Sequence, residues 1–313
     1  MTATSRTHPD FRHVLLVHDN DDELFEGIRA FVAQGLTSDG DVMVLGTRDR
    51  LGLMRELIGS DPRLEYGCVE DLYVDPMRTL FDFQRMLAER TEPRVLWATG
   101  SVPLGRDSAA QAAWNRFESA ANEALAPYPF RALCAYDTRT RPAPVIEAAR
   151  ATHPTVSVDL TNRASPDYVD PAVFLADELA QVPVSPTSSP SVATTVTDPH
   201  HLPWVRRLLA AGARSGSAVS SPSIERFLMA VHEVAANGLA HGGPPVRLTL
   251  WTDVAALTCL VEDSGPGNLD SMTGFRYPEG WSPMGLWTAR QLVDDLFIGK
   301  SASGGCSVLL TTS

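Results

Sequence analysis

Three polar side chains between residues 227 and 267 have types and spacing that suit metal and proton chemistry. Glu233 and Asn237 lie four residues apart, so a helix would project both from the same side. Asp263 stands at the end of an alternating apolar pattern, and Gly265 and Gly267 follow it at spacings typical of a loop. The amide oxygen suits a hard cation such as Mg²⁺, and the glutamate suits proton transfer. The glycines would let the backbone approach a ligand closely.

Regular elements are predicted on both sides of these residues. The segment from Phe227 to Leu239 has apolar residues at steps of three and four, which predicts a helix with one buried face. Ser221-Pro222-Ser223 precedes it and predicts a serine cap with proline in the first turn. Residues 192–196 predict an edge strand. Residues 246–251 and 255–261 predict two further strands, with Val246, Leu248 and Leu250 on one face of the first of these two.

The order Glu-x-x-x-Asn, Asp-x-Gly-x-Gly and Gly-Leu resembles the motifs of the Bergerat ATP-binding fold. Within that superfamily the region from Ser191 to Ser313 is most similar to anti-sigma-factor serine kinases of the RsbW type. Met284-Gly285-Leu286 resembles the last glycine motif, and the stretch from Gly304 to Leu310 resembles the closing turn and strand. The resemblance implies an α/β sandwich with helices on one face of a mixed sheet.

The same resemblance assigns roles to individual residues and implies ATP and Mg²⁺ as cofactors. Asn237 would hold the metal, Glu233 would act as the base, and Asp263 would accept a hydrogen bond from the adenine amino group. The remaining nucleotide-binding positions that it implies are Gly265, Gly267, Gly285 and Leu286. His241 is expected to cap the motif helix. The segment 268–283 is expected to be a mobile lid, with fewer glycines before Leu286 than relatives often show.

The first half of the chain alternates short apolar strands with helices. Strands are predicted at 13–18, 41–46, 66–72, 94–98 and 130–136, and helices at 23–34, 50–58, 76–89, 109–125 and 143–151. Gly35 is predicted to end the first of these helices. This alternation predicts a mostly parallel sheet covered on both faces. No GxxxxGK[ST] phosphate loop follows the first strand.

This half resembles the MEDS domain, a sensory module of methanogen and methylotroph regulators with a RecA-like α/β/α fold. The resemblance is carried by residues 13–18, Gly35-Leu36, residues 133–139, Thr152-His153-Pro154 and residues 167–171. It implies an unidentified small ligand. Because ligands bind at the carboxyl ends of parallel strands, His18, Tyr136 and Asp137 are candidates for a sensory pocket. His13 and His18 are interpreted as strand-end residues with satisfied hydrogen bonds.

Composition places further limits on the function. The 313 residues carry a formal charge of −12 and a pI of about 5.1, which argues against direct binding to nucleic acid. The sequence shows no apolar run of the length that a membrane span needs. The four cysteines have no CxxC spacing, so reduced thiols and a cytoplasmic location are expected and a zinc site is not.

Four regions are predicted along the chain. Residues 1–10 are expected to be a disordered lead, 11–181 a sensory domain, 182–190 a proline- and serine-rich linker, and 191–313 the ATPase domain. The whole predicts a regulator that phosphorylates a serine or threonine of an anti-anti-sigma (STAS) protein and captures a sigma factor. The alternatives are a non-catalytic, ATP-binding capture module and, less favoured, a sensor histidine kinase. The oligomeric state is left open, with a homodimer allowed.

Overall fold

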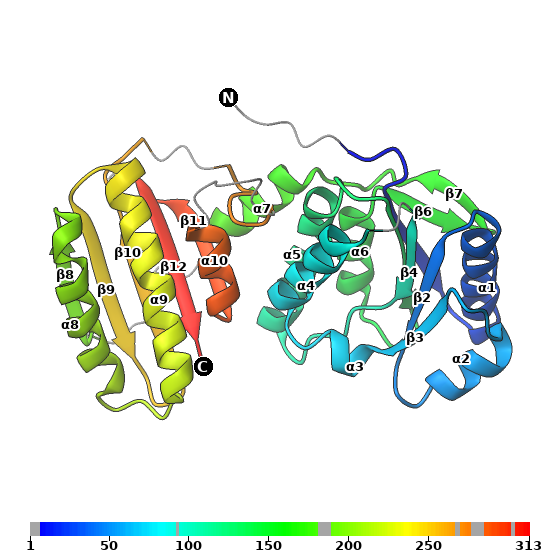
Figure 1. Cartoon of the computed structure of the whole chain (residues 1–313), viewed down its shortest axis with the longest axis horizontal. Helices are drawn as coiled ribbons and strands as arrows, with labels where there is room; N and C mark the ends of the chain where they lie inside the picture. The colour runs from blue at the N-terminus through cyan, green and yellow to red at the C-terminus, as the bar shows by residue number, and fades with distance from the viewer. Residues whose placement is uncertain (1–6, 92–93, 181–188, 267–269, 277–284, 302–303) are drawn as a thin grey trace. The chain divides into compact units, whose positions relative to one another are not determined.

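The computed structural model describes residues 7–91, 94–180, 189–266, 270–276, 285–301 and 304–313 (Figure 1). The chain divides into two compact units between Phe174 and Leu175, and each unit has its own sheet. The division falls inside helix α7 (Pro171–Ala180), somewhat before the boundary expected at residue 181. Most of the predicted linker lies outside the described residues. The predicted α/β fold class is confirmed in both units.

The N-terminal unit is built on a seven-stranded sheet in the order β3-β2-β4-β5-β1-β6-β7. The first six strands run parallel, and β7 is antiparallel to β6. The strands are β1 (Arg12–His18), β2 (Asp41–Gly46), β3 (Leu64–Cys68), β4 (Leu96–Gly100), β5 (Phe130–Asp137), β6 (Thr155–Val158) and β7 (Thr161–Ala164). The interior strand β1 therefore pairs with β5 and β6, which follow it much later in the chain.

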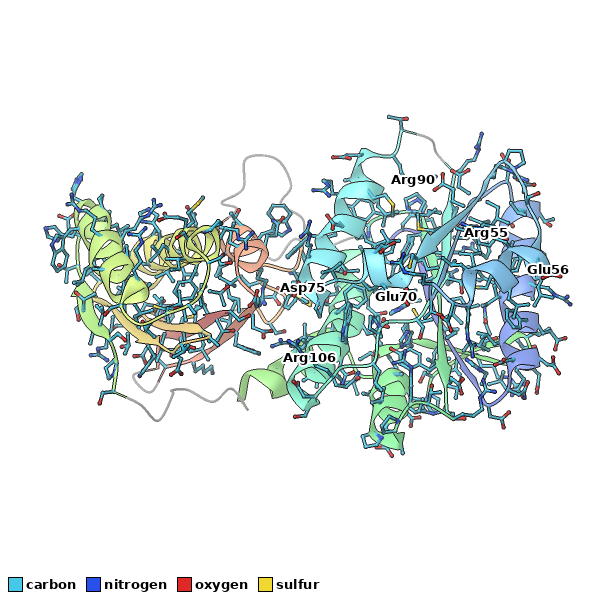
Figure 2. All side chains as sticks on the ribbon, turned by 90° about the horizontal axis from the view of Figure 1, so that it is seen from below. Arg55, Glu56, Glu70, Asp75, Arg90 and Arg106 are labelled. Carbon is cyan, nitrogen blue, oxygen red and sulfur yellow. The ribbon has the colours of Figure 1, made fainter. Side chains whose placement is uncertain are left out.

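Helices cover both faces of this sheet, as the predicted strand–helix alternation requires (Figure 1). The helices are α1 (Asp21–Thr37), α2 (Leu51–Ile58), α3 (Val69–Leu72), α4 (Pro76–Glu89), α5 (Ser108–Ala124) and α6 (Ala143–Thr152). Apolar residues of α1 pack against Val14, Val44 and Leu133 on one face. The opposite face lies under α4 and α5. The charged residues Arg55, Glu56 and Glu70, labelled in Figure 2, are exposed on the surface of this unit.

Trp97 is the largest side chain that is fully buried in this unit. Its ring meets Phe31 edge-on with centroids 5.0 Å apart, and the Arg131 guanidinium lies 4.6 Å from its centroid. A Cβ on Gly35 would lie 3.0 Å from the indole, and one on Gly40 would lie 2.6 Å from it. Gly35 is thus needed for packing and does not end α1, which continues to Thr37 with Ser38 as its cap. The prediction that Gly35 ends the first helix was therefore wrong.

Three other local predictions need correction. The strand expected at 66–72 is a shorter strand, β3, followed by the single helical turn α3. The hairpin of β6 and β7 was not predicted, because every residue of β7 is exposed and no apolar alternation marks it. The expected disordered lead is ordered from His8 onward. The His8 N–H donates to Ala126 O at 2.7 Å, and Asp10 accepts from Arg131 at 2.8 Å.

The C-terminal unit has a five-stranded antiparallel sheet in the order β11-β12-β10-β9-β8. Its strands are β8 (Val192–Val196), β9 (Val246–Thr252), β10 (Leu257–Glu262), β11 (Asp295–Lys300) and β12 (Cys306–Thr312). The edge strand predicted at 192–196 is confirmed. Val246, Leu248 and Leu250 of β9 are fully buried in the main core, as predicted.

One face of this sheet is covered by α8 (Leu202–Arg214), α9 (Ser221–Asn237) and α10 (Gly285–Leu292) (Figure 1). Phe227, Val231 and Val234 of α9 form the centre of the core, at the helical spacing that the sequence predicted. The cap of α9 is Ser220, whose hydroxyl accepts from the Ser223 N–H. The helix therefore begins at Ser221, the residue predicted to cap it. No described helix is long and apolar enough to cross a membrane.

We predict that Trp97→Ala lowers the free energy of unfolding of the N-terminal unit by about 3 to 5 kcal/mol, because it leaves a large cavity between α1 and the sheet. Urea unfolding followed by circular dichroism measures this change. The matched control is Trp204→Ala, since Trp204 is 53% exposed and its loss should change the free energy by no more than about 0.5 kcal/mol. Equal effects of the two substitutions would contradict this account of the core.

Candidate functional site

The predicted pair Glu233 and Asn237 lies at the C-terminal end of α9. Both side chains are half-buried, one helical turn apart on the same side of the helix. Asn237 is the last α-helical residue, and residues 238–242 continue as a single wider π-helical turn. Such turns often occur at functional sites, because they re-aim the chain without breaking the helix. Here the turn carries the backbone toward the end of β10.

Asp263 follows β10 and ties three chain segments together. Its N–H donates to Cys306 O at 2.9 Å. Its Oδ1 accepts from the N–H groups of Gly265 at 2.9 Å and Cys306 at 3.0 Å. Its Oδ2 makes no hydrogen bond to any described residue. The carboxylate is therefore held by one oxygen and can offer the other to a ligand.

Glycines surround the Asp263 carboxylate. A Cβ on Gly242 would lie 2.6 Å from Asp263 Oδ1, and one on Gly305 would lie 3.0 Å from the same oxygen. A Cβ on Gly265 would lie 2.5 Å from Gly242 Cα. No side chain fits at these positions without a shift of the backbone or the carboxylate. We call Gly242, Gly265 and Gly305 the glycine cradle of Asp263. The sequence prediction included Gly265 but missed Gly242, although its Gly242-Gly243 pair after a helix was a visible signal.

Gly285, in the last of the predicted motifs, lies against Asn237 of the first motif. It is the buried first residue of α10, and a Cβ there would lie 3.0 Å from both Cγ and Oδ1 of Asn237. Leu286 is half-buried and packs against the main core. The structure thus places Asn237 and Gly285 in direct contact, and the π-helical turn after Asn237 leads to the cradle of Asp263. Gly267 and Met284 lie outside the described residues.

The first part of the expected lid is packed in place. Met272 and Phe275 are buried, and the Arg290 guanidinium lies 3.9 Å from the Phe275 ring centroid. Arg290 also donates to Leu296 O at 2.7 Å, so it fastens residues 270–276 to the body of the domain. The expectation of a mobile cover is therefore wrong for 270–276. The rest of the expected lid, 268–269 and 277–283, lies outside the described residues.

His241 is exposed within the π-helical turn. The turn is ended by Gly243, which has a positive φ of 80°. Glycine adopts this conformation without strain, whereas other residues rarely do. A backbone glycine therefore ends the helical segment, in place of the capping role expected for His241.

The three residues proposed for a sensory pocket do not face one space. Tyr136 and Asp137 are neighbours in β5, so their side chains point to opposite faces of the sheet. Tyr136 is buried, and its hydroxyl donates to Glu118 at 2.9 Å. Asp137 forms hydrogen bonds with Arg139, which lower the pKa of its carboxyl to about 2. His18 is buried with Nδ1 3.1 Å from Asn20 O, and burial lowers its pKa.

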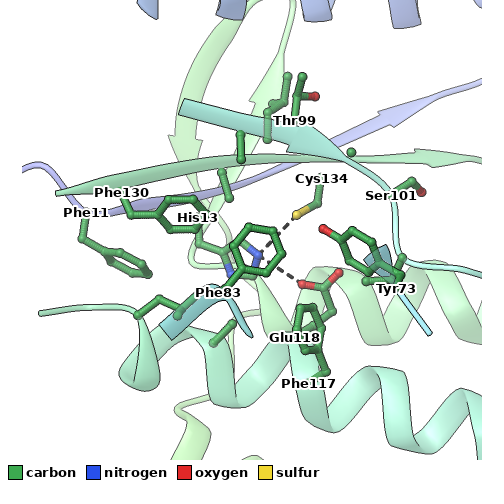
Figure 3. Close-up of a pocket in the computed structure, with 17 residues that line it drawn as sticks. Phe11, His13, Tyr73, Phe83, Thr99, Ser101, Phe117, Glu118, Phe130 and Cys134 are labelled. Atoms are coloured by element: carbon green, nitrogen blue, oxygen red, sulfur yellow. Dashed lines mark hydrogen bonds and ion pairs between the residues drawn. The ribbon is translucent and has the colours of Figure 1, made fainter. Parts of the chain in front are cut away.

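A cavity does exist in this unit, on the face of the sheet that α4 and α5 cover. Its walls include residues of β1, β4, β5 and the two helices. Five aromatic side chains line it, namely Phe11, Tyr73, Phe83, Phe117 and Phe130 (Figure 3). Its polar wall includes His13, Glu118 and Cys134. None of the three residues proposed from the sequence is part of its wall.

Comparison with known families matches each unit separately. Residues 12–154 match the model of the MEDS family, described as the methanogen/methylotroph, DcmR sensory domain. Residues 195–312 match the model of the histidine kinase-like ATPase domain. No curated protein matches the chain.

These two matches define the class of the protein as a sensory domain joined to an ATPase-type domain. The chain carries an N-terminal MEDS domain and a C-terminal histidine kinase-like ATPase domain. The match of the second domain implies ATP binding, and the glycine cradle with the remaining Asp263 oxygen fits a purine amino group.

We predict that Gly242→Ala weakens ATP binding about 10- to 150-fold, because the added methyl displaces the Asp263 carboxylate and removes a charged hydrogen bond. Isothermal titration calorimetry with ATP and Mg²⁺ measures the affinity. The matched control is Gly52→Ala in α2, where nothing lies within 4 Å of the added Cβ and affinity should not change. An unchanged affinity in Gly242→Ala would show that the Asp263 carboxylate is not a nucleotide contact.

Proposed function

We propose that this protein is an ATP-dependent signalling regulator whose C-terminal domain transfers phosphate to a serine or threonine of a partner protein. The observation that carries the proposal is the Asp263 carboxylate, held by two backbone N–H groups in a glycine cradle with Oδ2 left for a ligand. This arrangement suits recognition of adenine, since a fixed carboxylate oxygen accepts from an exocyclic amino group.

Asn237 and Glu233 would serve the phosphate end of the nucleotide. The Asn237 side-chain oxygen is a suitable Mg²⁺ ligand, and its contact with Gly285 keeps the amide fixed. A bound Mg²⁺ ion would neutralise charge on the phosphates. Glu233, one turn earlier on the same side, would accept the proton of the acceptor hydroxyl or orient a water molecule. Gly285 and Leu286 begin α10, whose N-terminus favours an anion.

The partner we propose is an anti-anti-sigma protein of the STAS type, with a sigma factor as the captured client. The similarity of residues 191–313 to anti-sigma-factor serine kinases supports this choice. A formal charge of −12 also supports action through protein partners, because nucleic acid would be repelled. The MEDS domain would control the activity in response to a small ligand.

Two alternative functions, a capture module and a sensor histidine kinase, would require different features of the chain. A non-catalytic capture module would bind ATP without transferring phosphate, and the single glycine before Leu286 favours it. A sensor histidine kinase needs a phospho-accepting histidine on a long dimerisation helix. His200 and His201 lie on a 3₁₀ helix of three residues, which counts against that alternative.

We expect Glu233→Gln to keep ATP affinity and to lower phosphate transfer about 10²- to 10⁴-fold, because a base is lost but no metal ligand is. Asn237→Ala should lose both magnesium-dependent binding and transfer. Labelled ATP with a panel of STAS proteins measures transfer, and calorimetry measures binding. Glu225→Gln is the matched control, since Glu225 lies on the same helix, is 47% exposed and pairs with Arg206 and Arg214.

These measurements of transfer and binding distinguish a kinase from a non-catalytic capture module. If the wild type and Glu233→Gln both bind ATP and a sigma factor but neither labels any STAS protein, the kinase proposal fails and the module stands. Autophosphorylation at His200 or His201 would support the sensor histidine kinase.

A further inference from the structure

Four side chains with metal-binding atoms meet inside the N-terminal domain. His13 comes from β1, Glu118 from α5, Cys134 from β5, and His153 directly follows α6. Their nitrogen, oxygen and sulfur atoms all lie within 4.8 Å of one another. His13, Glu118 and His153 are each at most 4% exposed. Figure 3 shows His13 pointing between Cys134 and Glu118. We call these four residues the His–Glu–Cys cluster.

Hydrogen bonds outside the cluster fix which ring nitrogens face inward. The Asn122 amide donates to the carbonyls of Glu118, Ser119 and Thr152. Its Oδ1 must therefore be the acceptor toward His13 Nδ1, 3.0 Å away. His153 Nδ1 donates to Ala149 O at 2.7 Å, because a carbonyl only accepts. Both histidines thus donate through Nδ1, and each turns its Nε2 toward the cluster.

The Glu118 carboxylate turns one oxygen toward these two ring nitrogens. Its Oε1 accepts from the Tyr136 hydroxyl, but Oε2 makes no hydrogen bond to any described residue. Oε2 lies 3.1 Å from His13 Nε2 and 3.6 Å from His153 Nε2. A buried carboxylate oxygen without a hydrogen bond is costly unless a positive charge lies beside it.

Spacing and chemistry both match a four-coordinate metal. Tetrahedral zinc with nitrogen, oxygen and sulfur ligands has ligand–ligand separations of about 3.3 to 3.8 Å. His13 Nε2 to Cys134 Sγ is 3.4 Å, and the two carboxylate distances lie near the same range. His13, His153 and Glu118 are each also oriented by an outer hydrogen bond, from Asn122, the Ala149 carbonyl and Tyr136 respectively, the usual arrangement around bound metals.

We propose that His13, Glu118, Cys134 and His153 bind one divalent transition-metal ion of the zinc class. Binding would form the metal–sulfur bond and release the Cys134 thiol proton to solvent, and the two ligand charges, carboxylate and thiolate, balance the 2+ ion. His13, Glu118 and Cys134 also line the aromatic cavity, which gives the ion an entry path.

The test uses full-length protein stripped with chelator and titrated with Zn²⁺ or Co²⁺ in the absence of nucleotide. We expect one ion per chain by elemental analysis. With Co²⁺ we expect a thiolate-to-cobalt charge-transfer band and the strong visible bands of a four-coordinate ion. Cys134→Ser should lose the charge-transfer band and at least about 100-fold in affinity. Asn122→Ala, which removes the partner of His13 Nδ1 but no ligand, should lose about 10- to 100-fold in affinity.

Controls and a measurement on the wild type guard against misfolding of the variants. Cys68→Ser is the matched control, because Cys68 lies outside the cluster and metal binding should be unchanged. In the wild type, Zn²⁺ should slow alkylation of Cys134 but not of Cys68, measured by peptide mass spectrometry. Two results would overturn the proposal. One is a folded wild type that binds neither ion, which would leave a metal-free His13–Glu118 ion pair. The other is binding that is equal in Cys134→Ser and Cys68→Ser, with Cys134 unprotected, which would place the ion on surface groups such as His200 and His201.

Discussion

The ATPase-type domain depends on the pair of hydrogen bonds that hold Asp263 Oδ1. They join the end of β10 to the start of β12 and to the loop that follows Asp263. Because the carboxylate sits this close to backbone, the residues around it must lack side chains, which explains why glycines from three separate segments meet there. The same contacts decide which carboxylate oxygen remains for a ligand. One residue therefore joins these segments and, in the proposed function, also contacts the nucleotide.

The MEDS domain contains a buried carboxylate, Glu118, whose charge must be compensated. Glu118 lies among aromatic and apolar side chains, where an unpaired carboxylate would be destabilising. Tyr136 satisfies one oxygen, and the histidines surround the other. Asn122 links this arrangement to the backbone of α5 and to Thr152 at the end of α6. A substitution at any of these residues would thus affect the packing of α5 and α6 and of strands β1 and β5.

The sequence predicted those features that depend on neighbouring residues. The elements at 41–46, 76–89 and 192–196 were predicted with the bounds that the structure has, since their apolar periodicity is unambiguous. Three motif residues of the ATPase domain, Glu233, Asn237 and Asp263, lie close together in sequence, so their spacing could be recognised. The His–Glu–Cys cluster could not, because its members come from four elements spread over most of the domain. The role of Gly35 was missed because packing against Trp97 is a tertiary contact.

The position of β1 also affects how the chain acquires its shape during synthesis. β1 leaves the ribosome well before its partners β5 and β6, which begin at Phe130 and Thr155. At translation rates of roughly 5 to 20 residues per second, its apolar residues wait roughly 6 to 25 s for the first of these partners. In that interval the apolar side chains of β1 have α1, Val42, Val44 and Trp97 to pack against, but its backbone has neither of its strand partners. The antiparallel pair of β9 and β10 has no such delay, since the two strands are consecutive.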